Sequence, residues 1–198
     1  MMETTGAHFL PGDIEKTGST ADVARGEVMR IIGIDPGSHN TGWGIVEVEG
    51  TRFRRVASGT MSPKASGLGG RLLGISDGLE CILQEHHPTE SAVESVFYSK
   101  NAQSALKLGH ARGVVFAGLA RAGLEIGEYS PTQVKQTLTG TGRAAKEQVA
   151  KMVRLLLGYS EKMGLDESDA LAIAICHGQF YGSAATKMIE AAKRGKRA

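Results

Sequence analysis

Apolar residues in the first third of the chain are separated by short Gly-rich and polar joints, and they predict three successive strands. Residues 29–35 are apolar at almost every position, as is typical of a strand buried on both faces. Residues 42–48 and 53–61 follow after short joints, as in a meander of hairpins. The next segment, which ends before Pro88, repeats apolar residues at helical spacing: Leu68, Leu72, Ile75, Leu79, Ile82 and Leu83. The pattern therefore predicts three strands followed by a helix.

The rest of the chain alternates predicted strands with predicted helices. Short apolar runs with strand character cover residues 91–97 and 124–130. Helices are predicted between and after them, over residues 101–122, 131–138, 144–157 and 166–182. Ser130 followed by Pro131 is a typical helix start, because Pro fits the first helical position. The order of elements predicts an α/β fold with a central mixed five-stranded sheet flanked by helices.

Length and composition indicate one domain with two dissimilar ends. A chain of 198 residues, 41% of them hydrophobic, is long enough for one core of ordinary size. We expect that domain over residues 29–182, after a flexible extension over residues 1–28 and before a basic, disordered tail over residues 183–198. The extension lacks the basic start and the apolar stretch of a secretory signal.

Cysteine usage and hydropathy favour a cytoplasmic protein. Cys81 and Cys176 lie in apolar surroundings without metal-ligand spacing, so we expect buried, reduced thiols. No stretch approaches the roughly 18 consecutive apolar residues that a membrane-spanning helix requires. The sequence thus predicts cytoplasmic localisation and no membrane partner.

The charge is distributed unevenly, although the formal net charge is only +2. Residues 1–28 have a local charge of −3, and residues 181–198 one of +4. Residues 101–154 contain eight Lys or Arg and three Glu, a local charge of +5. Such a block is typical of a solvated helix face and also of a phosphate-binding surface, so the charge alone does not identify a partner.

Four carboxylates stand where apolar residues are expected or tolerated. Asp35 ends the first buried strand, and Glu94 lies within the apolar run "SAVESVF". Asp166 and Asp169 are three residues apart at the start of an apolar helix, and this spacing places them on one helix face. Each has a structural alternative when it is taken alone: a turn for Asp35 and a helix cap for Asp166. Glu94 is harder to explain, because Glu is rarely buried without a partner.

Taken together, these acids predict a metal site. Two carboxylates ~4 Å apart repel by about 4 kcal/mol at an effective dielectric constant of 20, so a cluster requires a strong positive counter-charge. Oxygen ligands without His or Cys at ligand spacing suit Mg²⁺ or Mn²⁺ better than Zn²⁺. Two such ions held by shared acids can activate water for phosphodiester cleavage. We therefore interpret Asp35 as a metal ligand.

Five blocks of sequence carry a resemblance to a known family. They are, in chain order, "IGIDPGS" with "TGWG", then "AVESVF", "KNAQSALKLGHARG", "PTQVKQTLTGTGRAAKEQVAKMV" and "DESDALAIAICH". Together they resemble the RuvC-type Holliday junction resolvases from about residue 29 to residue 180. The first block recurs in other folds, so the resemblance depends on the ordered set.

This resemblance implies a ribonuclease H-like fold in which Asp35, Glu94, Asp166 and Asp169 form one acidic, catalytic and metal-binding pocket. It implies a homodimeric crossover junction endodeoxyribonuclease of DNA recombination and repair that binds four-way junction DNA and nicks two opposed strands symmetrically. The ends left would be 5′-phosphate and 3′-hydroxyl, and the cofactor Mg²⁺ or Mn²⁺, two ions per site. The resemblance also implies RuvA and RuvB as partners.

The resemblance further assigns DNA-binding residues. Phe97 matches the aromatic residue that stacks on an unpaired base, and Lys135 and Lys146 match basic residues near the scissile phosphate. Physical chemistry supports these roles, because aromatic rings stack on bases and lysines neutralise phosphates. Core packing for Phe97 and simple solubility for the lysines are the alternatives. Further candidates for DNA contact are Tyr98, Asn101, Lys107 and Arg112, although Asn101 also suits a helix cap.

Three other functions remain as alternatives. The "GIDPGS" block also resembles the phosphate-binding hairpin of sugar kinases and actin-like ATPases, but those proteins have two such half-domains and no second copy is visible here. A nucleic-acid-binding module without activity would not need all four acids. The nearest alternative is a ribonuclease H-like nuclease that acts on ribosomal RNA precursors.

Overall fold

The computed structural model describes residues 28–95 and 102–195, with side chains as far as residue 181. Five strands form one sheet with the order β3-β2-β1-β4-β5. β1 is antiparallel to β2, β2 to β3, and β1, β4 and β5 are parallel, which confirms the predicted mixed sheet. The strand bounds are Met29–Asp35 (β1), Thr41–Glu49 (β2), Arg52–Met61 (β3), Glu90–Glu94 (β4) and Ile126–Tyr129 (β5).

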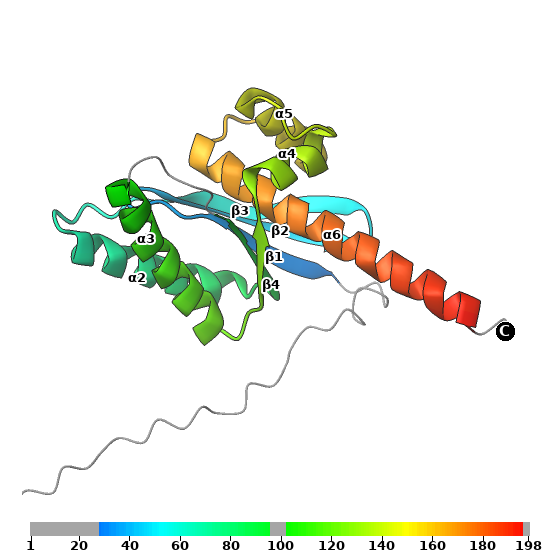
Figure 1. Cartoon of the computed structure of the whole chain (residues 1–198), viewed down its shortest axis with the longest axis horizontal. Helices are drawn as coiled ribbons and strands as arrows, with labels where there is room; N and C mark the ends of the chain where they lie inside the picture. Colours follow the sequence, from blue (N-terminus) through cyan, green and yellow to red (C-terminus); the bar gives the residue numbers. More distant parts are fainter. Residues whose placement is uncertain (1–27, 96–101, 196–198) are drawn as a thin grey trace, which may run out of the picture.

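Helices cover both faces of the sheet (Figure 1). One face packs against α2 and α3, and the other against α4, α5 and α6. The helix bounds are Leu68–His86 (α2), Ala102–Arg121 (α3), Pro131–Thr139 (α4), Lys146–Leu157 (α5) and Leu165–Gly195 (α6). All the predicted strands and helices are therefore present, and the two faces of the sheet account for two separate apolar clusters.

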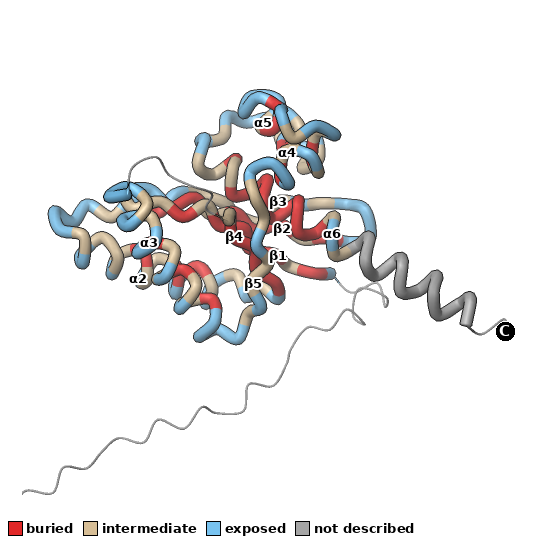
Figure 2. Tube along the Cα trace, in the orientation of Figure 1, coloured by how far each residue is buried: buried red, intermediate tan, exposed pale blue. Residues whose placement is uncertain are grey.

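β1 is apolar throughout because both of its faces are covered. Ile32 and Ile34 pack toward α2 and α3, whereas Met29 and Ile31 pack toward α6. All three isoleucines are fully buried, and Figure 2 shows buried residues along the central strands and in the part of α6 that lies on them. Alternate residues of a strand face opposite sides. Gly33 and Asp35 therefore follow Ile31 on the α6 side.

Glycines in β1 and β2 let α6 lie very close to the sheet. A Cβ atom added to Gly33 would stand 2.2 Å from the carbonyl oxygen of Ala170, and one added to Gly42 would stand 2.1 Å from that of Asp166. Only glycine permits such an approach, although it costs conformational entropy on folding. The glycines of the "IGIDPGS" and "TGWG" blocks thereby set the first turns of α6 against β1 and β2.

The start of α4 follows the predicted capping chemistry. Ser130 accepts a hydrogen bond from the backbone amide of Gln133, the Gln133 side chain accepts one from the Ser130 amide, and Pro131 opens the helix. This reciprocal pair satisfies two amides that have no partner within the helix.

Three features differ from the sequence-based prediction or lie outside the described residues. α6 continues to Gly195, whereas a domain end at 182 and a disordered tail were expected; residues 183–195 include four Ala and two Lys, which favour helix. Cys81 is exposed, because it lies on the solvent side of α2, while Cys176 is buried as predicted. Residues 1–27 and 196–198 lie outside the described part of the chain. None of the helices described is long and apolar enough to cross a membrane.

Candidate active site

Asp35 and Glu94 end two neighbouring parallel strands on the same face of the sheet. Ile34 of β1 pairs with Val93 of β4, so the next residues, Asp35 and Glu94, stand side by side at the strand ends. Ala92 packs in the cluster on the α6 side, and Glu94 is two residues further along the same strand. Both carboxylates therefore face α6.

α6 brings the other two acids to the same place. Asp166 lies in its first turn, and Asp169 follows three residues later on the same helix face. Gly42, which pairs with Asp35 across β1 and β2, touches the backbone of Asp166. The close approach of α6 to the sheet thus places Asp166 and Asp169 beside the ends of β1 and β4.

The pKa values of the carboxyl groups reflect this convergence. Burial raises the pKa of Asp35 from 3.8 to about 7, and the negative charges of Glu94, Asp169 and Asp166 add to the effect. Burial also raises the pKa of Glu94, and the charge of Asp169 contributes next. Neighbouring like charges disfavour ionisation only at short range. The four acids named from the sequence therefore form one cluster, which we call the acidic cluster.

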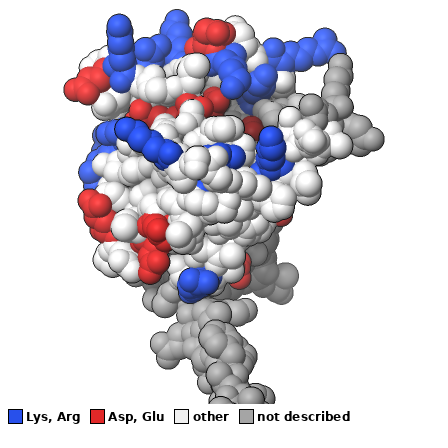
Figure 3. Space-filling model, turned by 90° about the vertical axis from the view of Figure 1, so that its left-hand side faces the viewer, with Lys and Arg blue, Asp and Glu red and all other residues white. Residues whose placement is uncertain are grey.

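Basic side chains surround the acidic cluster. Lys146, at the start of α5, donates a hydrogen bond to Asp169 with an Nζ–Oδ2 distance of 3.0 Å. This bond raises the pKa of Lys146. Positive charges of Lys146, Lys135 and Arg112 act to lower the pKa of Glu94. The face drawn in Figure 3 accordingly shows a row of acidic side chains with Lys and Arg above and below it.

Arg112 holds the end of β4 in place. Its guanidinium donates to the backbone carbonyl of Glu94 and pairs with the carboxylate of Glu128 on β5. It also lies 4.5 Å from the centre of the Phe116 ring. These contacts give Arg112 a role inside the protein in addition to the DNA contact predicted from the sequence.

Within the described residues, the structure does not connect the other predicted DNA-binding residues with the acidic cluster. Lys107 is exposed on α3, and no contact recorded for the described residues joins it to the four acids. Phe97, Tyr98 and Asn101 lie in the segment 96–101, outside the described residues. Their roles stay predictions.

Comparison with known proteins identifies the family. The family model described as crossover junction endodeoxyribonuclease RuvC matches residues 31–177. RuvC of Paramagnetospirillum magneticum is 49% identical over 78% of this chain and 94% of its own length. RuvC of Paracoccus denitrificans is 50% identical over 75% of this chain and 91% of its own length. The chain belongs to the RuvC family.

A solved RuvC structure has the same fold. The Thermus thermophilus RuvC structure in complex with a Holliday junction substrate is similar with a TM-score of 0.75 and 35% sequence identity. The match covers 79% of this chain and 97% of that one. It confirms the ribonuclease H-like fold predicted from the sequence blocks.

The donor chemistry of the acidic cluster suits a hard divalent cation. All four side chains offer carboxylate oxygens, the ligands that Mg²⁺ and Mn²⁺ prefer. Burial, and after it the repulsion from the neighbouring carboxylates, raises the pKa of Asp35, and a bound cation would relieve that repulsion. In the part of the chain that the structure describes, no three Asp, Glu, His or Cys side chains are already arranged around one point as metal ligands.

Sequence reasoning missed the role of Glu167, which stands next to Asp166. Its carboxylate turns to β3, where it accepts hydrogen bonds from Ser58 and Arg55. An acidic residue in a first turn is favourable to the helix dipole, and this role alone is enough to explain Glu167 in the sequence. Arg55 and Glu167 are 112 positions apart, so no local pattern in the RuvC sequence signals their contact.

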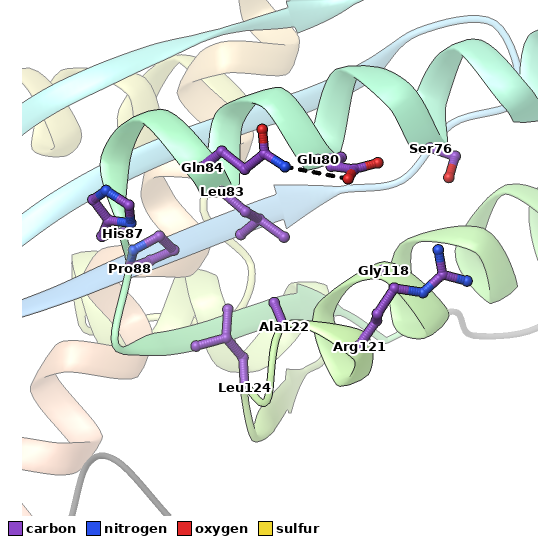
Figure 4. Close-up of a pocket in the computed structure, with 10 residues that line it drawn as sticks. All are labelled: Ser76, Glu80, Leu83, Gln84, His87, Pro88, Gly118, Arg121, Ala122 and Leu124. Carbon is purple, nitrogen blue, oxygen red and sulfur yellow. Dashed lines mark hydrogen bonds between the residues drawn. The ribbon is translucent and has the colours of Figure 1, made fainter. Parts of the chain in front are cut away.

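A cavity of about 440 Å³ lies at the other end of the sheet (Figure 4). It is formed between α2 and α3, with Leu83, Arg121 and Leu124 among its lining residues. Pro88 also lines it, shortly before β4 begins, whereas the acidic cluster lies where β4 ends. The cavity is therefore separate from the candidate active site.

In the metal-free protein, the raised pKa of Asp35 predicts a loss of stability as pH rises from 3.8 to about 7. In this range the folded protein keeps the proton of Asp35 and the unfolded chain has lost it, so the free energy of unfolding falls with increasing pH. The loss can reach about 4 kcal/mol, because each pKa unit corresponds to about 1.4 kcal/mol. Urea unfolding in EDTA at both ends of this pH range measures the change in the free energy of unfolding.

Asp35→Asn is the control for this experiment. The amide does not titrate, so the variant should be more stable than the wild type at neutral pH and should lose less stability across the range. The same pH dependence in both proteins would contradict the assignment.

Proposed function

We propose that this RuvC-family chain is a structure-selective endodeoxyribonuclease that resolves four-way Holliday junctions in recombination and DNA repair. The observation that carries the proposal is the meeting of Asp35, Glu94, Asp166 and Asp169 at one end of the sheet. The similar Thermus thermophilus RuvC, which was solved with a Holliday junction substrate, supports this choice of substrate.

Asp35, Glu94, Asp166 and Asp169 would hold two Mg²⁺ or Mn²⁺ ions. When bound, these ions supply Lewis acidity that favours deprotonation of water and stabilises charge on the leaving oxygen. The chemistry of the donor set supports such a site, because four carboxylates beside one another lack enough positive charge without a cation. Lys146 provides part of that charge through its bond to Asp169.

The residues of the chain position the reacting groups. The carboxylates orient a water molecule in line with the scissile phosphate, and the bond between phosphorus and the 3′ oxygen breaks as the water oxygen attaches. The 3′ oxygen takes up a proton, which leaves 5′-phosphate and 3′-hydroxyl ends. Lys135 and Lys146 lie close enough to the cluster to influence Glu94, so they can neutralise the approaching phosphates.

Symmetric cleavage of two opposed strands requires two active sites. One chain supplies one acidic cluster, so we propose that the protein works as a homodimer whose two clusters face two opposed strands of a junction. Phe97, Tyr98, Asn101, Lys107 and Arg112 are proposed as further DNA contacts. RuvA and RuvB are proposed as partners on the grounds of family resemblance.

Incubation of the purified protein with a synthetic four-way junction and Mg²⁺ or Mn²⁺ tests this function. We expect paired nicks at opposed positions near the crossover, with ends that DNA ligase can seal. A linear duplex with the sequence of two adjoining arms is the matched control and should stay intact, as should the junction in EDTA. Equal cutting of the linear duplex, or of a structured ribosomal RNA precursor in place of the junction, would contradict the proposal.

A further inference from the structure

Glu167 lies between Asp166 and Asp169 in the sequence, and its side chain contacts β3. One of its carboxylate oxygens accepts hydrogen bonds from the Ser58 hydroxyl and from Arg55, the latter with an Nη2–Oε1 distance of 3.1 Å. The other oxygen accepts from the backbone amide of Gly164 at 3.1 Å. The Glu167 and Arg55 side chains are only 17% and 24% exposed. Both oxygens of Glu167 are thus engaged within the protein.

Arg55 is itself held from several sides. Its Nε donates to the Ser58 hydroxyl, and its guanidinium lies 4.9 Å from the centre of the Tyr159 ring in the connection between α5 and α6. Charge-assisted hydrogen bonds of this kind are stronger and more directional than neutral ones. The contacts therefore join β3, the connection after α5 and the first turn of α6.

An irregularity in β3 makes this arrangement possible. Val46 pairs with Arg55 and Ile45 pairs with Ala57, so the register shifts by one residue between them. Without the extra residue, Arg55 and Ser58 would face opposite sides of the sheet, because side chains alternate along a strand. The bulge brings both to the α6 side, and bulges commonly re-aim side chains next to active sites.

We propose that Arg55, Ser58 and Glu167 form a clamp that positions the first turn of α6, and with it Asp166 and Asp169, beside Asp35 and Glu94. The proposal rests on the proposed function. Attractive contacts are useful at this place, because Asp166 and Asp169 carry the same charge as Asp35 and the start of α6 nevertheless lies against β2. The clamp supplies such contacts on the neighbouring strand. Its members are positioning residues, since their polar groups contact one another, the Gly164 amide and Tyr159 rather than the acidic cluster.

Substitutions at both ends of the clamp test the proposal. We expect Glu167→Ala and Arg55→Ala each to slow single-turnover cleavage of a saturating junction about tenfold, because small displacements of reacting groups cost large factors in rate. The double variant should be no slower than the slower single variant, since both changes break the same contact. Glu167→Gln keeps acceptors and a similar shape, so it should recover part of the rate. Junction affinity in EDTA should change less than twofold.

Arg54→Ala is the matched control. Arg54 is the next residue on β3 and also pairs with a glutamate, Glu47, but this pair lies on the face of the sheet away from α6. Arg54→Ala should leave the cleavage rate and the Mn²⁺ concentration for half-maximal rate unchanged. The clamp variants should require a higher Mn²⁺ concentration for half-maximal rate.

Hydrogen exchange in EDTA separates a local role from a general loss of stability. The clamp predicts faster amide exchange in the first two turns of α6 in Glu167→Ala and unchanged exchange in β1 and β4. Wild-type cleavage rates in both single variants, or faster exchange throughout the sheet and α6, would overturn the clamp. If the wild-type protein itself does not cut the junction, the proposed function fails, and the exchange comparison still tests the clamp.

Discussion

Replacing Asp35 with asparagine is expected to abolish cleavage of a four-way junction while leaving junction binding intact. Asp35 ends the strand that lies between β2 and β4, and the charges of Glu94, Asp169 and Asp166 all act to raise its pKa. Asparagine has nearly the same shape but no negative charge, and it is a poorer ligand for a hard cation. Gel mobility in EDTA measures binding, and strand mapping after addition of Mg²⁺ measures cleavage.

Asp77→Asn provides the control for this substitution. Asp77 is exposed on α2, so its replacement should leave both cleavage and binding at wild-type levels. Wild-type cleavage by Asp35→Asn would contradict the assignment of Asp35 to the active site. Loss of binding together with cleavage would show that Asp35 supports the fold or the DNA surface instead of the chemistry.

Gly42→Ala is expected to have a large effect although Gly42 carries no functional group. The added Cβ would stand 2.1 Å from the carbonyl oxygen of Asp166 and 2.6 Å from its carbonyl carbon, and neither backbone atom can rotate away. The start of α6 must then shift outward. We expect a loss of about 1–3 kcal/mol in the free energy of unfolding, as for overpacked cores. The displacement of Asp166 should lower cleavage about 100-fold.

Gly69→Ala is the matched control for the added methyl group. Gly69 is exposed in the first turn of α2, and its added Cβ would meet no heavy atom within 4 Å. This variant should fold at least as stably as the wild type, because alanine favours helix, and should cleave normally. Chemical denaturation and junction cleavage measure both variants. A Gly42→Ala protein with wild-type stability and rate would show that the close approach of α6 is dispensable.

Local patterns in the sequence were sufficient to predict the strands and helices and to select the four acids as candidate site residues. The apolar run of β1 predicted a strand covered on both faces, and Ile31 and Ile34 are fully buried against helices on opposite sides. Asp35 and Glu94 stood out because they interrupt apolar strands. Their convergence with Asp166 and Asp169 could be expected from the family resemblance, and the strand register and the pKa shifts supply its physical basis.

Contacts between distant segments could not be read from the sequence. In the sequence, the glycines of β1 and β2 look like interruptions of a strand. Only the position of α6 shows that they leave room for a helix backbone: a Cβ added to Gly33 would lie 2.2 Å from the carbonyl oxygen of Ala170. The register shift in β3 depends on the pairing of β3 with β2. The contact between Arg55 and Glu167 therefore could not be predicted from the sequence either. The basic block over residues 101–154 was likewise ambiguous until packing placed Lys135 and Lys146 near Glu94.

The position of bound Mn²⁺ tests the central claim most directly. Crystals of the protein grown with MnCl₂ and measured near the manganese absorption edge reveal the ion through its anomalous scattering. The account predicts an anomalous peak within coordination distance of Asp35 and of at least two among Glu94, Asp166 and Asp169, and its loss in Asp35→Asn. Well-ordered crystals whose anomalous peaks lie only at other surfaces, with the four carboxylates unliganded, would contradict it.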